Sequence, residues 1–315
     1  MKTAVVAIGG NAILRAGQPP TYWNQMSNLR ETCVHLAGLI ASGYDMVLTH
    51  GNGPQVGNII LQNELLREDV PPMPMDVCVA QSQGQLGFMI QQTLTEALGA
   101  QGVDKVVSTL LTRVLVDPED PAFENPTKPV GPFYSRQEAE EMSRERGWTF
   151  REDLKRGGYR RVIPSPRPVD IIERRTIRRL VFGGEDQAEV VVAAGGGGIP
   201  VIRRGDHLEG VEAVVDKDLA ACVLACSIDE SLLVLLTDVD QVYLDYQEDP
   251  KPLGRVTVEE MASYQEEGQF PPGSMGPKVE AALRFLRAGG ERAIITSPEL
   301  IEKALRGEAG THVVL

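Results

Sequence analysis

Three glycine-rich turns follow short apolar segments of the chain, and their backbones could bind an anion. They are Gly9-Gly10, Gly51-Asn52-Gly53 and Gly195–Gly198. In parallel α/β sheets, ligands bind at the carboxyl ends of the strands, where such turns present N–H groups and helix dipoles. Glycine also lets the backbone approach a ligand closely. Any one of them alone is better explained as a tight turn, but three at the same edge of one sheet favour a phosphate or carboxylate site.

Two lysines stand at predicted helix starts, where a positive charge is unfavourable. Lys217 lies between Asp216 and Asp218 ahead of an apolar helix, and Lys278 follows the segment Gly273-Ser274-Met275-Gly276-Pro277. Because a lysine at a helix N-terminus opposes the macrodipole, the pair is easier to understand if an anion lies between them. Each aspartate could instead be a helix N-cap and each lysine a solvated side chain. Lysines held by aspartate suit phosphoryl transfer, in which the protein mainly positions reactants and neutralises oxygens.

Other phosphate and hydrolase chemistries lack their sequence motifs. The chain has no P-loop motif G-x-x-x-x-G-K-[ST] and no G-x-S-x-G nucleophile turn. The dinucleotide fingerprint G-x-G-x-x-G also fails, because Val56 and Pro200 stand where the third glycine would follow Gly51 and Gly195. His50 could line the site at a strand end, although an imidazole with a structural role is the simpler interpretation.

The charge and the cysteine usage limit the class of protein. A formal net charge of −13 and a pI of about 4.9 disfavour a nucleic acid or an anionic membrane as partner. We see no signal peptide and no apolar run of membrane-spanning length, so we expect a cytoplasmic protein. The four cysteines and four histidines show no metal-ligand spacing. We therefore expect buried thiols in a reducing compartment, at Cys33, Cys78, Cys222 and Cys226.

The elements that would position the turns and lysines alternate between strand and helix. Predicted strands are 3–8, 45–50, 105–116 (one strand, or one with an extension), 189–194, 232–236 and 293–296. Predicted helices are 25–42, 54 to about 68, 76–98, 217–227 and 278–288. Continuous Val, Ile and Leu runs that alternate with helices predict an α/β fold with a mainly parallel sheet covered on both faces.

One region interrupts this alternation. Residues 117 to about 168 are rich in Pro, Arg and Glu and include the clusters 125–129 and 164–168. A structureless loop of this length is uncommon inside a compact domain. We interpret the region as a small inserted subdomain that protrudes from the first lobe.

At these residues the sequence resembles the carbamate kinase family, and the matching segments span nearly the whole chain. The proline-rich insert and the GSMGPKVEA segment are the most specific of them within the wider amino-acid kinase fold. One difference is Tyr159, where the family usually has tryptophan. The matching segments are 7–12, 50–57, 83–88, 125–134, 160–166, 194–201, 216–218 and 273–281.

The resemblance implies an open three-layer αβα sandwich with an N-terminal carbamate-binding lobe at 1–180 and a C-terminal nucleotide-binding lobe at 181–315. It also implies a homodimer and the reversible reaction of ATP with carbamate to ADP and carbamoyl phosphate, with Mg²⁺. Many related kinases carry a lysine where this chain has Ala7. Lys128 in the insert is our candidate for the missing charge.

For that reaction we assign roles residue by residue. We expect no general base, because carbamate is already an anion. We also expect no protein ligand for a metal ion. Lys217 and Lys278 would contact the transferring phosphoryl group, and Asp218 would organise them. Donors to the oxygens would come from Gly9, Gly10 and Asn11. The carbamate side would be formed by Gly51, Asn52, Gly53, Gly195 and Gly196, with Lys128 closing over it. The nucleotide pocket would be shaped by Asp216, Asp238, Tyr243, Met275, Gly276 and Pro277.

Two alternatives remain open from the sequence. Another kinase of the same fold, such as an N-acetylglutamate kinase, needs a different first lobe for its longer acceptor, and the PTKP segment of the insert speaks against it. A nucleotide-binding regulatory protein without catalysis is the second alternative, against which the intact lysines and Asp218 speak. The sequence does not give the physiological direction of the reaction.

Overall fold

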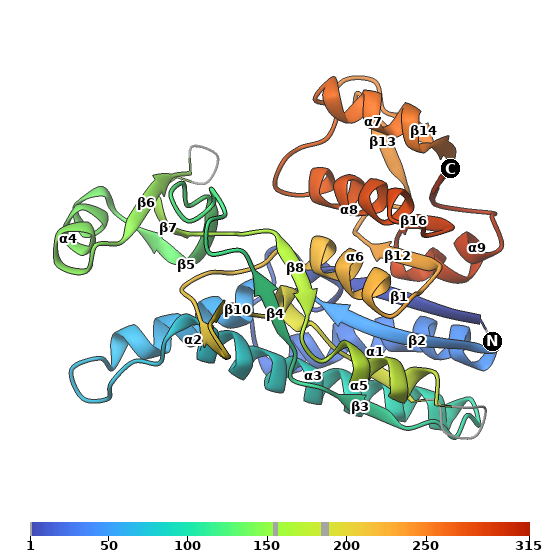
Figure 1. The fold of residues 1–315 in the computed structure, drawn as a ribbon, viewed down its shortest axis with the longest axis horizontal. Helices are drawn as coiled ribbons and strands as arrows, with labels where there is room; N and C mark the ends of the chain where they lie inside the picture. The colour runs from blue at the N-terminus through green and yellow to red at the C-terminus, as the bar shows by residue number, and fades with distance from the viewer. Residues whose placement is uncertain (1, 154–156, 184–188) are drawn as a thin grey trace.

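The computed structural model describes residues 2–153, 157–183 and 189–315, and its main feature is an eight-stranded sheet with helices on both faces (Figure 1). Among the described strands of this sheet, only the pair β16–β17 is antiparallel. The predicted open αβα sandwich with a mainly parallel sheet is therefore confirmed. In spatial order the strands are β15 Arg255–Thr257, β17 Thr311–Val314, β16 Arg292–Thr296, β12 Leu232–Leu236, β1 Lys2–Ile8, β2 Tyr44–His50, β9 Val190–Val192 and β3 Val107–Thr109.

The central strands are buried on both faces, because their side chains alternate between two separate cores. In β1, Val5 and Ala7 belong to one core and Ala4, Val6 and Ile8 to the other. The first core is completed by α5 Arg174–Val181, α6 Lys217–Ser227, α7 Val258–Glu266 and α8 Met275–Arg287. The second is completed by α1 Tyr22–Ala41, α3 Met75–Ala100 and α9 Ile301–Leu305.

A second sheet of four strands corrects one prediction, the strand at 105–116, with or without an extension. That segment forms β3 in the main sheet and β4 in the second sheet. The break lies at Thr112, whose backbone N–H donates to Gln83 Oε1 (2.9 Å) and whose carbonyl accepts from Gln83 Nε2 (3.2 Å). The Gln83 side chain thus takes the place of a ladder partner for the Thr112 N–H, while the Thr112 carbonyl also accepts from the backbone N–H of Ile199 at 2.9 Å. The second sheet runs β11 His207–Gly210, β10 Ile199–Arg204, β4 Arg113–Val116 and β8 Pro168–Ile171.

The predicted insert is a small subdomain that protrudes from the main body (Figure 1). It consists of an antiparallel sheet and α4 Arg136–Arg146, which begins with a capping box between Ser135 and Glu138. Residues 154–156 of the insert lie outside the described residues. Its sheet packs against α2 Gly53–Leu65, where a Cβ on Gly57 would lie 3.5 Å from the backbone nitrogen of Gly131. Its strands are β5 Lys128–Tyr134, β7 Tyr159–Ile163 and β6 Thr149–Glu152.

Several elements of the last third of the chain were not predicted from the sequence. They include the hairpin of β13 Val242–Leu244 and β14 Lys251–Leu253, and also β15, α7, α9 and β17. The lobe boundary at residues 180 and 181 stays a prediction. Strands that follow it in sequence join earlier ones in space, because β9 pairs with β2 and β3, and β10 pairs with β4.

The long helix α3 packs closely against the edge strand β3. A Cβ on Gly87 would lie 2.2 Å from Thr109 Cγ2, so only glycine allows this approach. Gly84, one turn earlier and exposed, has no atom within 4 Å of an added Cβ. Within the described ranges, neither α3 nor any other helix is long and apolar enough to span a bilayer.

We predict that Gly87→Ala lowers the free energy of unfolding by about 1–3 kcal/mol, because the new methyl group overpacks the contact with Thr109. Gly84→Ala on the same helix is the matched control and should raise stability by roughly 0.5–1 kcal/mol through the better helix propensity of alanine. Urea unfolding of both variants measures the difference. Equal stability of the two would show that α3 does not depend on this close approach.

Candidate active site

Two adjoining cavities lie at the carboxyl ends of the central strands. The first has a volume of about 340 Å³ and the second about 600 Å³. Five residues line both cavities, among others that line only one of them. We call the two cavities together the lysine cleft. The shared residues are Gly10, Lys217, Gly273, Ser274 and Lys278.

One carboxylate holds the two lysines of the cleft. Asp218 accepts from Lys217 Nζ at 2.5 Å through Oδ1 and from Lys278 Nζ at 3.1 Å through Oδ2. All three side chains are nearly buried, with exposed fractions of 12% for Lys217, 10% for Lys278 and 5% for Asp218. Two ammonium groups share one carboxylate, so one positive charge is left over for an anion. Burial, partly offset by Asp218, lowers the pKa of Lys217, and a bound anion would favour its charged form.

The lysines reach this position because α6 and α8 both begin at the cleft. Asp216 is the N-cap of α6, and its Oδ1 accepts from the backbone N–H of Asp218 at 2.9 Å. Lys217 is the first residue of α6, and Lys278 lies in the first turn of α8 after Pro277. The positive ends of two helix dipoles therefore add to the two ammonium groups.

Lys128, on the first strand of the insert, also reaches the cleft. Its Nζ donates to Asp216 Oδ2 at 2.9 Å. Burial alone would raise the pKa of Asp216, but Lys128, then Lys217 and the backbone of Asp218, lower it below its ordinary value. Asp216 thus serves as a helix cap with one oxygen and anchors the insert with the other.

The first two glycine turns lie side by side with the lysines. A Cβ on Gly51 would be 3.5 Å from both the Gly10 nitrogen and Lys217 Cδ, which places this turn in van der Waals contact with both. Asn11 Nδ2 donates to Asp238 Oδ2 at 2.8 Å, which joins the turn after β1 to the turn after β12. Gly9 packs more closely, because its Cβ would lie 2.9 Å from the carbonyl oxygen of Leu236, so this position favours glycine.

The third turn, Gly195–Gly198, is mostly a packing feature. Three of its glycines have positive φ, and a Cβ on Gly197 would lie 2.1 Å from the carbonyl of Val215. Gly196 alone of the four lines the cleft, and a Cβ there would meet Asn52 Nδ2 at 2.1 Å. Gly195 is buried, and its carbonyl accepts from Gln83 Nε2 at 2.9 Å.

Supporting residues on α3 were missed by the sequence analysis. Ser82 Oγ accepts from Asn52 Nδ2 at 2.8 Å and so holds a predicted substrate residue in place. Gln83 fixes both Gly195 and the Thr112 turn. The usable signal was the run of small and amide residues at 82–87, which is unusual inside a long helix.

The other predicted site residues divide into two groups. Gly53 and Pro277 line the smaller cavity and Asp238 the larger one. Met275 and Gly276 begin α8, and Tyr243 lies on β13 with its hydroxyl bonded to Asp240 Oδ1 at 2.8 Å; none of these three lines the cleft. The larger cavity is also lined by residues without an assigned role, notably Arg15 and Glu31, which form an ion pair.

Comparison with known proteins agrees with this geometry. A sequence profile of the amino acid kinase family matches residues 2–297. Carbamate kinase from Pyrococcus horikoshii is 49% identical over 98% of this chain and 98% of its own, and that from Clostridium perfringens is 45% identical over 98% and 99%. The structure of Giardia lamblia carbamate kinase bound to AMP-PNP superposes with a TM-score of 0.92, at 42% identity, over 99% of this chain and 98% of that one.

The chain belongs to the amino acid kinase family, and within it to the carbamate kinases. The insert and the α8 segment, which carried the resemblance to carbamate kinases in the sequence, supply Lys128 and Lys278 to the cleft. The insert and the α8 segment thus complete a cleft whose other walls are the glycine turns and the start of α6. Among the described residues no group of three or more His, Cys, Asp or Glu side chains could hold a metal ion.

His50, at the end of β2, is fully enclosed behind the cleft. A Cβ on Gly195 would lie 2.3 Å from its Nε2, and its Nδ1 lies 3.0 Å from the Gly51 carbonyl. Burial, opposed by this hydrogen bond and reinforced by nearby Lys217, lowers the pKa of His50 to about 4. The imidazole is therefore neutral at pH 7 and donates through Nδ1, which favours the structural role.

We predict that His50 makes the folded state sensitive to acid. The unfolded chain binds this proton near pH 6.5 and the folded state only near pH 4, so stability falls across that window by up to about 3 kcal/mol. His50→Gln should remove this part of the pH dependence. Urea unfolding at pH 7 and at about pH 5 tests it. An unchanged difference between the two pH values in the variant would contradict the assignment.

Proposed function

We propose that this chain catalyses reversible phosphoryl transfer between ATP and carbamate, giving ADP and carbamoyl phosphate. The observation that carries the proposal is the pair Lys217 and Lys278, held by one carboxylate between two cavities. It is supported by the full-length match to carbamate kinases and by the AMP-PNP complex of the Giardia relative.

The reaction requires two anions to meet. A carbamate oxygen attacks the γ-phosphorus of ATP, a new O–P bond forms, and the bond from that phosphorus to the β,γ-bridging oxygen breaks, leaving ADP. Because carbamate is already deprotonated, no side chain has to remove a proton. The protein contributes preorganised positive charge, which Lys217, Lys278 and the two helix N-termini supply where the phosphoryl oxygens gain charge.

The two cavities suggest where each substrate binds. The smaller one is lined by Gly51, Asn52, Gly53 and Lys128, and we assign it to carbamate. The lysines that line both cavities would bind the phosphoryl group while it is transferred from one substrate to the other. We keep Asp238, Tyr243, Met275 and Gly276 as proposed neighbours of the nucleotide. Asp216 and Pro277, which we expected there, line only the smaller cavity, so we assign them to the carbamate side, with Gly195 and Gly196 behind it.

The chemistry of the acidic residues fits a magnesium ion that arrives with the nucleotide. Asp216 and Asp218 are engaged by lysines, whereas Asp238 is exposed and lines the larger cavity. Mg²⁺ usually binds one or two carboxylates together with substrate phosphates and waters. In place of the expectation that no protein residue binds the ion, we therefore propose that Asp238 and the nucleotide phosphates would hold it, and that it would neutralise phosphate charge when bound.

We also propose a cytoplasmic homodimer. β3 is an outer strand of the main sheet, and exposed apolar side chains flank it, at Phe88, Val106 and Leu111. Such an edge is normally covered or blunted. Light scattering should give the mass of two chains for the wild type, and Val106→Asp should shift it toward one. A wild-type mass of a single chain would overturn the dimer.

The first functional prediction concerns the substrate and the two lysines. Purified protein should form ATP from ADP and carbamoyl phosphate, and it should require Mg²⁺. Lys217→Ala and Lys278→Ala should each lower kcat by on the order of 10²-fold or more, because each removes a preorganised charge. Lys303→Ala, at an exposed lysine on α9, is the matched control and should keep wild-type turnover. Activity with N-acetylglutamate but not with carbamoyl phosphate would refute the proposed substrate. Near-wild-type turnover of either lysine variant would refute the catalytic role of that lysine.

The second functional prediction concerns Lys128. Lys128→Ala should damage turnover or the use of carbamoyl phosphate and leave ADP affinity nearly intact, because Lys128 lines only the smaller cavity. The oligomeric state should not change. Steady-state kinetics and calorimetric titration with ADP on the same variant measure both effects. Unchanged kinetics would remove Lys128 from the site, and a parallel loss of ADP binding would place the insert over the nucleotide.

A further inference from the structure

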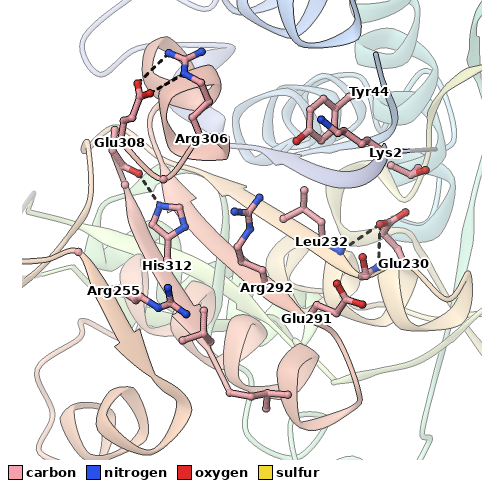
Figure 2. Close-up of a pocket in the computed structure, with 18 of the residues that line it drawn as sticks. Lys2, Tyr44, Glu230, Leu232, Arg255, Glu291, Arg292, Arg306, Glu308 and His312 are labelled. Carbon is pink, nitrogen blue, oxygen red and sulfur yellow. Dashed lines mark hydrogen bonds and ion pairs between the residues drawn. The ribbon is translucent and has the colours of Figure 1, made fainter. Parts of the chain in front are cut away.

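A second, larger cavity lies at the opposite edge of the main sheet. Its volume is about 1190 Å³, and we call it the amino-edge cavity (Figure 2). It is lined by the first residues of three parallel strands, Lys2 of β1, Leu232 of β12 and Arg292 of β16. Arg255 of β15, a strand that runs antiparallel to these three, lines it beside His312 of β17. The lysine cleft lies at the other end of β1 and β12, so the two sites do not overlap.

Three groups that can carry positive charge meet at one side of this cavity. Figure 2 shows Arg292 in the middle, with Arg255 and His312 on one side of it. Within the part of the chain that the structure describes, neither arginine has a carboxylate partner. Arg292 makes one long hydrogen bond, from Nη2 to the Leu305 carbonyl at 3.4 Å. Two guanidinium groups are thus left without counter-charge in a protein of net charge −13.

The carboxylates of the cavity do not supply the missing counter-charge. Three of them are already engaged: Glu308 by Arg306, Asp229 by Arg178, and Glu230 by the backbone N–H groups that follow it. Glu291 is exposed and lies on the other side of Arg292 in Figure 2. Leu315, whose terminal carboxylate is the fifth acidic group of the lining, is also exposed. The remaining cation, Lys2, lies over the Tyr44 ring, 5.5 Å from its centroid. Within the described residues, Arg255 and Arg292 are therefore the two guanidinium groups of this cavity that form no ion pair, whereas Arg306 is paired with Glu308.

His312 is fixed in place and sensitive to this charge. His312 is only 9% exposed, and its Nε2 donates to the Ala309 carbonyl at 2.9 Å. Burial first, and then Arg292 and Arg255, lower the pKa of His312, against the opposing effect of this hydrogen bond. An anion between the three groups would relieve their mutual repulsion and favour the imidazolium form.

We propose that the amino-edge cavity binds a phosphate group between Arg255, Arg292 and His312. The planar guanidinium fork donates two parallel hydrogen bonds to a phosphate, which makes arginine well suited to this anion. The cavity is far larger than one phosphate and also contains Tyr44 and Leu232, so it has room for the organic part of a phosphate monoester. The same chemistry would accept inorganic phosphate. This site is separate from the proposed phosphoryl transfer, so either assignment can fail without the other.

Histidine resonances provide a direct test, because the chain has only four histidines. His312 reports on the amino-edge cavity, and His50 beside Lys217 reports on the lysine cleft. Titration with inorganic phosphate, and separately with glycerol phosphate, should shift the His312 ring signals along a saturable curve and raise the pKa of His312. His312→Gln assigns the signal. Tighter binding of glycerol phosphate would assign a monoester, and tighter binding of inorganic phosphate would assign the free anion.

Variants that remove one charge from the cavity test whether phosphate affinity depends on its positive groups. Arg292→Gln should weaken phosphate binding by about tenfold or more, because a charge-assisted hydrogen bond is lost, and Arg255→Gln should also weaken it. Glu291→Gln should leave binding equal or tighter, because it removes a repulsive charge. Circular dichroism checks that each variant is folded, and Arg292→Lys keeps the charge if Arg292→Gln does not fold. The proposal is overturned if His312 shows no saturable shift, or if Glu291→Gln weakens binding, which would indicate recognition of an amino group instead.

Discussion

The carboxylate of Asp218 lies between two nearly buried ammonium groups, and the geometry of the cleft depends on this contact. Removing three charges from water is costly, and their mutual attraction offsets the cost only when the contacts are close. Here they are 2.5 and 3.1 Å, and all three side chains lie at the starts of two helices that pack against each other. The two lysines and the aspartate together carry one net positive charge, which an anion bound in the lysine cleft can compensate.

The parallel sheet makes this contact achievable. β12 and β16 end side by side, and the helices that flank them on one face, α6 and α8, begin at the same edge of the sheet. The turn after β2 then lies beside both Lys217 and the turn after β1, because a Cβ on Gly51 would be 3.5 Å from Lys217 Cδ and from the Gly10 nitrogen. The insert adds Lys128 through Asp216, the residue that also caps α6. One aspartate thus links the insert to the helix that carries the central contact.

The sequence predicted the parts of this structure that repeat a local pattern. Runs such as 232–236 are apolar on both faces, so a buried parallel strand was readable, and Asp216-Lys217-Asp218 was readable as a helix start. The break at Thr112 was not, because it depends on Gln83, which is distant in sequence. The four glycines at 195–198 were readable as a turn, but their packing against Val215 and Val114 is a tertiary contact. The capping box at Thr257 and Glu260 was a local signal for α7 that went unused.

Asp218→Asn tests the central claim most directly, because it keeps the shape of the side chain and removes the charge that holds both lysines. If Asp218 positions the lysines for phosphoryl transfer, kcat for ATP formation from carbamoyl phosphate should fall by on the order of 10²-fold. The affinity for ADP should stay equal or rise, since two ammonium groups then face the phosphates without a competing carboxylate. Urea unfolding of the variant separates this effect from loss of the fold. Near-wild-type turnover in a folded Asp218→Asn protein would contradict the account.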